Sequence, residues 1–223
     1  MAFNLSSISK GKQIKAPRII VLGVEKIGKT TFSCGTTFEN GKIVGHGSNH
    51  PVGIPIKGET GMDDMDIPKF PTSESFDNVL QALASLYEGE HDFRTTVIDS
   101  ASAMEPIIWD AVCAAHKVKT IEEVGGGYGK GYTESLGLWR NFLEGLDGLR
   151  DHKNMASIII GHVKVKRFDD PNGESYDQYQ FDINDKASNL LFRWADLILF
   201  CNTKVVVKKE DKGFGAKKAR GID

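Results

Sequence analysis

The sequence predicts an α/β protein with a mostly parallel sheet that has helices on both of its faces. Apolar runs of strand length alternate along the chain with longer segments in which apolar residues recur at helical spacing. The runs are continuously apolar, as in Ile19–Leu22 and Leu197–Phe200, which is typical of parallel strands covered on both faces. A glycine-rich turn directly after the first run is a third sign of this class.

Length and composition narrow the choice further. A chain of 223 residues allows one large domain, or one domain and a small appendage. With 40% hydrophobic and 26% charged residues, a disordered or collagen-like protein is excluded. No apolar run approaches the roughly 20 residues of a membrane span, and the N-terminus lacks the apolar stretch of a secretory signal. Cys34, Cys113 and Cys201 are too few and too far apart for a disulfide framework, so we expect a cytoplasmic protein without membrane contact.

The net charge of −2 conceals an uneven distribution. Residues 1–30 hold six Lys or Arg against one acidic residue, and residues 203–223 hold seven against three. Basic ends on an acidic middle suggest a localised anion-binding face, although two solvated tails would give the same numbers. We therefore divide the chain into a basic N-terminal arm (1–17), a core (18–202) and a C-terminal strand or hairpin with a basic tail (203–223).

The elements of the first half follow from local patterns. The β-branched run Arg18–Gly23 predicts a buried strand, and Gly35 limits the helix that starts at Lys29. After these we expect a hairpin turn at Asn40-Gly41, a short strand over Val52–Ile56 and an acidic loop over 58–71.

In the second half, Ser75 is the expected N-cap of an amphipathic helix over 76–88. The spacing of Ser102 and Glu105 matches a capping box that would open the next helix. The remaining expectations are strands over Thr95–Asp99, Met155–Gly161, Leu197–Cys201 and 204–207, a loop over 125–131 and a helix over 134–150.

The turn after the first strand carries a phosphate-binding motif. It matches G-x-x-x-x-G-K-[ST] in full, and it lies between a buried strand and the start of a helix. Its backbone N–H groups can surround a β-phosphate, Lys29 can reach the β- and γ-phosphates, and Thr30 can offer its hydroxyl to Mg²⁺. We expect ATP and Mg²⁺ as ligands. The expected nucleotide-binding residues are Gly23, Val24, Glu25, Lys26, Ile27, Gly28, Lys29, Thr30 and Thr31.

A second acid is needed to complete the magnesium shell. Asp99 ends the apolar strand Thr95–Asp99, and the carboxyl ends of parallel strands share the edge of the sheet where ligands bind. Thr30 and Asp99 are therefore the expected metal residues, with Ser100 as a group that could polarise a metal-bound water. The alternative is that Asp99 only caps the following turn.

Ser100 stands where many AAA+ motors carry a second acid, so the residue that orients the attacking water must come from elsewhere. RecA-type ATPases place a Glu at the end of the strand that follows the P-loop helix. Here that strand is Val52–Ile56 and Glu59 lies just beyond it, with Asp63 and Asp64 as rivals. A merely solvated acidic loop is the alternative.

His162 ends a third apolar strand, where a polar residue can sense the γ-phosphate; the alternative is a hydrogen-bonded structural histidine. Three cations follow it, Lys164, Lys166 and Arg167, and then a polar loop with Tyr176, Tyr179 and Phe181. Cations interleaved with aromatics suit single-stranded DNA, although a solvated loop has the same composition.

Two further basic stretches can each be interpreted either as functional or as merely structural. The loop 125–131 lacks the G-x-G-x-x-G register, so Lys130 either contacts DNA or belongs to a plain connector. Lys218 and Arg220, near the C-terminus, either reach the γ-phosphate of a neighbouring subunit or lie in a solvated tail.

Together these segments resemble a known family. They are the phosphate loop Gly23–Thr31, the strand 96–100, the stretch Gly127–Tyr132, the segment Gly161–Pro171 and the tail 209–214. Over about 17–220 they resemble bacteriophage NTP-binding proteins, the RecA-like single-strand-annealing recombinases of the Sak type. The resemblance implies a RecA-like P-loop NTPase core, ATP and Mg²⁺ binding, single-stranded DNA binding and phage recombination beside a single-strand binding protein. It also implies roles for Lys29, Thr30, Asp99 and Glu59 in the nucleotide site.

Residues 35–50 depart from the pattern as an insertion, and the chain stops soon after Arg220, where relatives run further. The function expected is a magnesium-dependent ATPase that acts on single-stranded DNA as a homo-oligomer, either a ring or a filament. The alternatives are an AAA-type remodelling or motor ATPase that acts on protein, and a nucleotide-dependent switch with little turnover.

Overall fold

A computed structural model describes residues 8, 10–11, 14–39, 42–46, 49–171, 173–204, 206–209 and 219–222. Its centre is a five-stranded sheet in the order β4-β5-β6-β1-β9, and every neighbouring pair is parallel. The strands are β1 (Arg18–Gly23), β4 (Pro51–Pro55), β5 (Thr95–Asp99), β6 (Ala156–Gly161) and β9 (Leu197–Cys201). The predicted fold class, an α/β fold of the P-loop NTPase type, is confirmed.

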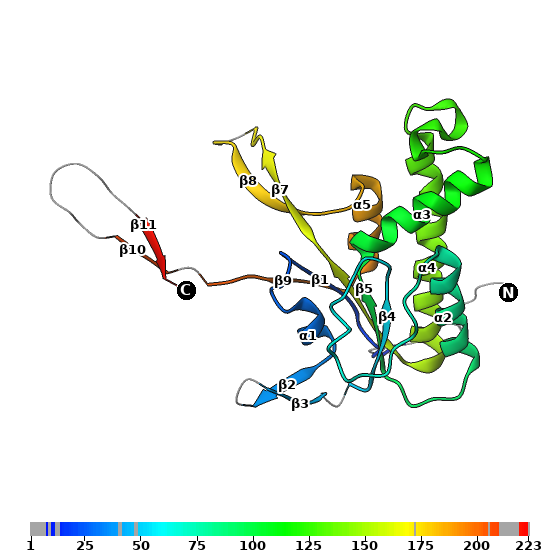
Figure 1. The fold of residues 1–223 in the computed structure, drawn as a ribbon, viewed down its shortest axis with the longest axis horizontal. Coiled ribbons are helices and arrows are strands. Elements are labelled where there is room, and N and C mark those ends of the chain that lie inside the picture. The colour runs from blue at the N-terminus through cyan, green and yellow to red at the C-terminus, as the bar shows by residue number, and fades with distance from the viewer. Residues whose placement is uncertain are drawn as a thin grey trace.

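Helices cover the sheet unequally. The larger core cluster joins one face of the sheet to α2 (Phe76–Glu88), α3 (Ala101–His116), α4 (Lys130–Lys153) and α5 (Asp185–Trp194), which Figure 1 shows on the same side of the strands. The short helix α1 (Lys29–Ser33) lies on the opposite side. There the second cluster packs Val21, Val97 and Ile160 against Cys34 and Met62. Residues alternate between the two clusters because successive side chains of a strand point to opposite faces.

In the part of the chain that the structure describes, three antiparallel pairs lie outside the central sheet, among them the β7–β8 hairpin, which extends away from it in Figure 1. They are β2 (Thr36–Glu39) with β3 (Lys42–His46), β7 (Val163–Phe168) with β8 (Tyr176–Phe181), and β10 (Val206–Lys209) with β11 (Ala219–Ile222). The segment after His162 was expected to lead into a polar loop. It instead forms two paired antiparallel strands, so the register determines on which face of the hairpin each side chain lies.

Several helix boundaries differ from the expected ones. Helix α3 begins at Ala101, and its N-cap is Ser100, whose hydroxyl accepts from Ala103 N. The expected capping box is wrong because both of its side chains have distant partners: Ser102 Oγ accepts from His162 N, and Glu105 accepts from Asn184 N. Part of the expected glycine loop is a 3₁₀ segment, η2 (Ile121–Gly126). Helix α4 begins four residues early, and α5 was not predicted.

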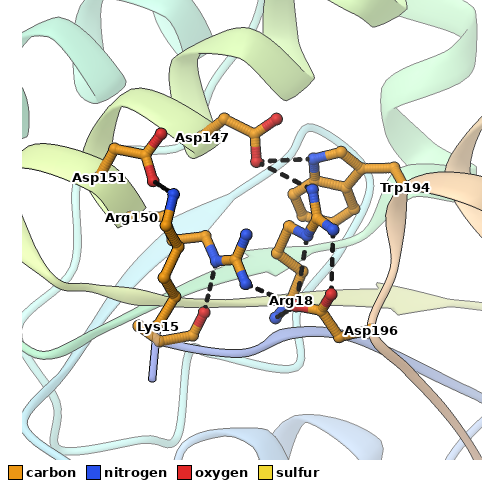
Figure 2. Close-up of polar contacts among 8 residues, drawn as sticks. Lys15, Arg18, Asp147, Arg150, Asp151, Trp194 and Asp196 are labelled. Atoms are coloured by element: carbon orange, nitrogen blue, oxygen red, sulfur yellow. Dashed lines mark hydrogen bonds and ion pairs between the residues drawn. The ribbon is translucent and has the colours of Figure 1, made fainter. Parts of the chain in front are cut away.

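An ionic network closes the amino-terminal end of the sheet (Figure 2). The Arg18 guanidinium donates to Asp196 at 2.9 Å and to Asp147 at 3.4 Å, and it lies over the Trp194 ring. Trp194 Nε1 also donates to Asp147, at 3.0 Å, and Arg150 donates to Asp196 at 3.2 Å. The network thereby ties the start of β1 to α4 and to the turn between α5 and β9.

Residues of the expected N-terminal arm join this end of the fold. Ala16 O accepts from Arg150 Nε at 2.7 Å, Pro17 O accepts from Ser157 N, and Lys15 pairs with Asp151. Among the helices that the structure describes, none is long and apolar enough to cross a membrane. All three cysteines are free, in line with the expected absence of a disulfide framework.

Candidate nucleotide-binding site

The P-loop motif lies at the carboxyl-terminal edge of the sheet, between β1 and α1. Gly28 precedes α1 with a φ of 93°, a left-handed conformation that glycine adopts without steric cost. A cleft of about 360 Å³ opens beside the motif. It is lined by Glu25, Lys26, Gly28, Lys29, Thr30, Thr31, Glu59, Thr60, Gly61, Asp99 and His162. The predicted phosphate, metal and catalytic residues are thus brought into one site.

Lys29 is held inside the turn of the P-loop. The residue is only 5% exposed. Its Nζ donates hydrogen bonds to Gly23 O at 2.9 Å and to Val24 O at 2.8 Å. Burial lowers the pKa of the ammonium, against the nearby acidic groups that raise it. Charged phosphate oxygens are stronger acceptors than carbonyls, so this ammonium is placed to exchange one set of acceptors for the other.

Thr30 and Asp99 form the expected metal pair. Thr30 Oγ1 donates to Asp99 Oδ2 at 2.8 Å, and burial raises the Asp99 pKa to about 6, although the Thr30 hydrogen bond opposes that change. Gly61 lies over both oxygens: a Cβ at this position would stand 2.6 Å from Thr30 Oγ1 and 2.7 Å from Asp99 Oδ2. Two hard oxygen ligands under a space without a side chain fit Mg²⁺, which keeps several waters and phosphate oxygens as its other ligands.

Glu59 is anchored by two donors at the edge of the cleft. Ser100 Oγ donates to Glu59 Oε1 at 2.5 Å, and His162 Nε2 lies 2.8 Å from the same oxygen. The His162 hydrogen bond is the main cause of the lowered Glu59 pKa, and the same bond raises the pKa of His162. Asp63 and Asp64 are exposed and do not line the cleft.

His162 connects the P-loop lysine to this carboxylate. Its Nδ1 lies 3.4 Å from Lys29 Nζ and 3.8 Å from Glu25 Oε1, on the side of the ring opposite Glu59. Because a carboxylate only accepts, Nε2 is the nitrogen that donates to Glu59. Backbone N of His162 donates to Ser102 Oγ at 3.0 Å, which fixes the histidine to the start of α3.

The expected DNA-binding residues lie on two elements. Lys164, Lys166 and Arg167 belong to β7, where each pairs with an acidic residue: Asp182, Asp185 and Asp169, respectively. Lys130 begins α4, and its Nζ donates to Gly125 O at 2.9 Å. The three β7 cations retain exposed side chains, so their weak surface pairs can be exchanged for phosphates.

The expected trans-acting cations fall at the C-terminal end. Lys218 lies outside the described residues. Arg220 belongs to β11 and is in register with Lys208 of β10.

Sequence reasoning missed two residues that shape this site, Gly61 and Ser102, and one buried acid, Glu105, that contacts the N-cap of α5. Gly61 covers the metal pair, Ser102 fixes His162, and Glu105 accepts two hydrogen bonds from Asn184 N with oxygens 2.8 and 3.0 Å away. Glu105 is buried, which raises its pKa to about 7. For Gly61, the only available signal was that a glycine occurs in the loop that follows β4. Ser102 and Glu105 gave none, since their spacing also matched a local cap.

The strand β1, the phosphate loop and the helix α1 are accompanied by an acid, Asp99, at the end of β5, which β6 separates from β1 in the sheet. This arrangement defines a P-loop NTPase. Comparison with protein families places the chain within this class: a family model described as an AAA domain matches residues 15–223. The chain belongs to that family and is accordingly a nucleotide-binding ATPase of the AAA type. No curated protein matches it.

Proposed function

We propose that this ATPase hydrolyses magnesium-bound ATP and acts on single-stranded DNA in phage recombination, in the host cytoplasm. The observation that carries the proposal is the chain of contacts from Lys29 through His162 to Glu59, which continues without a break into the basic strand β7. A change at the γ-phosphate and a change at the hairpin therefore act on the same histidine.

In the proposed reaction, Lys29 binds the β- and γ-phosphates, and Thr30 and Asp99 hold Mg²⁺. The metal neutralises charge on the phosphates when it is bound. Glu59 orients a water for attack and accepts its proton at Oε1 or Oε2. Ser100 and His162 keep the carboxylate ionised and aimed into the cleft, as the lowered pKa of Glu59 supports.

The hairpin supplies the proposed DNA contact. Lys164 and Lys166 are two residues apart and share one face of β7, with Arg167 on the other face. Since the net charge of the whole chain is −2, we expect binding to be local and of modest affinity. Lys130 is a secondary candidate contact, because its ammonium already holds Gly125.

Assembly completes the proposal. We expect a homo-oligomer, a ring or a filament, in which Lys218 or Arg220 reaches the γ-phosphate of a neighbouring subunit. A single-strand binding protein is the expected partner on DNA. The family match also fits an AAA-type remodelling or motor ATPase that acts on protein, and the experiment below separates the two. The third candidate, a nucleotide-dependent switch, would show little ATP turnover.

The test is a fluorescence-anisotropy titration of single-stranded DNA at several salt concentrations. Replacement of Lys164, Lys166 and Arg167 by Ala should lower the affinity and flatten the salt slope by up to roughly 2, at about 0.7 per phosphate. Nucleotide affinity should persist, because Lys29 is unchanged. Equal affinity and slope for the triple variant would move the DNA site elsewhere. If the wild-type protein binds no DNA and a protein stimulates its ATPase, the remodelling function replaces the proposal.

A further inference from the structure

A second cleft, of about 390 Å³, lies between the β7–β8 hairpin and α5. It shares no lining residue with the nucleotide cleft. Leu22, the last residue before the P-loop glycine Gly23, forms part of its lining. The cleft is therefore separate from the ATP site but adjoins the strand from which the phosphate loop emerges.

Helix α5 presents a polar face to this cleft. Three of its residues, Ala187, Leu191 and Trp194, are buried in the core. The cleft is lined by a different set, at the i, i+3, i+4 and i+7 spacing of one helix face: Asp185, Ser188, Asn189 and Phe192. The helix thus divides into a core face and a face that borders the cleft.

The hairpin presents one cation, Lys166, and the amides of Gln178 and Gln180 to the same cleft. Lys166 is in register with Gln178, and Lys164 with Gln180, so these side chains share a face of the hairpin. Within the part of the chain that the structure describes, the side-chain amides of Gln178, Gln180 and Asn189 make no hydrogen bond. Each amide offers both a donor and an acceptor, which is the pattern that the edge of a nucleobase requires.

Aromatic rings complete the lining. Phe181 and Phe192 lie with their ring centroids 5.8 Å apart. Phe181 and Leu22 also line the cleft but are almost fully buried, so each contributes only a small exposed area. Tyr179, which is half exposed, packs against Phe200 with centroids 5.1 Å apart. Flat apolar surfaces beside unpaired amides are the recognition elements that proteins use for unstacked bases.

We propose that this cleft takes one unstacked base of a single strand whose phosphates lie along the cations of β7. The inference rests on the proposed function, because it deepens the same DNA contact. The Lys166–Asp185 pair, at 3.5 Å and exposed, borders the cleft and can open as a phosphate takes the place of the aspartate. A bound base would touch Leu22, next to the P-loop, and this gives DNA a direct contact with the strand that positions the nucleotide.

The test compares two oligonucleotides of equal length, one with normal bases and one with abasic sites, by fluorescence anisotropy at fixed salt. The wild-type chain should prefer the normal strand by roughly tenfold, the size of one stacked base. Q178A/Q180A removes two of the amides that would hydrogen-bond the base and leaves the aromatic rings, so it should reduce that preference severalfold without abolishing it. N189A should lose part of it. Gln81→Ala, an exposed glutamine on α2, is the matched control and should keep the full preference.

Each outcome decides between the two proposals. Equal binding of both strands by the wild type, or an unchanged preference in Q178A/Q180A and N189A, would overturn the base cleft and leave the hairpin contact standing. Failure of the wild type to bind either strand would overturn both. Fluorescent-nucleotide affinity confirms that each variant is folded, and N189A decides the question if the double variant does not fold.

Discussion

The two ends of the central sheet differ in how the surroundings shift the pKa values of their charged side chains. At the amino end, the Arg18 hydrogen bonds lower the pKa of Asp196, and Asp196 in turn raises the pKa of Arg18, so pairing favours the charged forms. At the carboxyl end, burial raises the pKa of Asp99 to about 6 and lowers that of Lys29, so for these two groups the surroundings disfavour the charged forms. The neighbouring Glu59–His162 pair favours the charged forms of both partners, as the Arg18–Asp196 pair does. At the carboxyl end, groups whose charged forms are favoured thus lie beside groups whose charged forms are disfavoured, and such perturbed groups cluster at functional sites.

The largest expected effect belongs to the carboxyl end. Lys29→Ala should abolish magnesium-dependent ATP binding, because backbone amides alone do not replace a cation at the γ-phosphate. Fluorescent-nucleotide titration at matched Mg²⁺ measures this. Unchanged nucleotide affinity would contradict the assignment of the site.

Glu59→Gln should slow ATP hydrolysis by about 10² or more while ATP remains bound, the usual size for a lost general base. The amide keeps the shape of the side chain and the contact with Ser100, so the change removes chiefly the basicity. Single-turnover hydrolysis is the measurement. Asp63→Asn and Asp64→Asn are the matched controls and should behave as wild type; if either of them slows hydrolysis and Glu59→Gln does not, the base has been misassigned.

Gly61→Ala sharpens the comparison without touching a charge. A methyl group would stand against Thr30 Oγ1 and Asp99 Oδ2, so the apparent Mg²⁺ affinity of ATP hydrolysis should fall roughly tenfold. Gly137→Ala is the control, since a Cβ there meets no atom within 4 Å. A Mg²⁺ titration with wild-type response in Gly61→Ala would mean that the metal is held away from this pair.

Arg18→Ala tests the amino end and should have the smallest effect on function. Loss of its hydrogen bonds to Asp196 and Asp147 should reduce the free energy of unfolding by about 1–2 kcal/mol, in the range for partly exposed charged groups. ATP affinity should stay at the wild-type value. Denaturant unfolding measures the change in stability, and nucleotide titration of the same sample measures the ATP affinity. A loss of ATP binding without a loss of stability would mean that Arg18 serves the nucleotide site and not the stability of the fold.

The residues at the carboxyl end of the central sheet are easier to predict from the sequence than the secondary-structure elements around them. The motif spacing and the apolar strands suffice to place Lys29, Thr30 and Asp99 together, because parallel strands end at a common edge. Other buried polar contacts join residues far apart in the chain: Ser102 accepts from His162 N, 60 positions away, and Glu105 accepts from Asn184 N at the start of α5, 79 positions away. No local pattern encodes such contacts. The β7–β8 hairpin and α5 were missed for a related reason: polar composition matches a loop as well as it matches exposed strands and a short amphipathic helix.

We propose that the nucleotide site and the basic hairpin act through one histidine, His162. This proposal is tested most directly by the steady-state ATPase rate with and without single-stranded DNA, in the wild type and in the variant that lacks the cations of β7. We expect DNA to change the wild-type rate severalfold and to leave the variant's rate unchanged, while both proteins bind ATP equally. A wild-type rate that does not respond to DNA would contradict it.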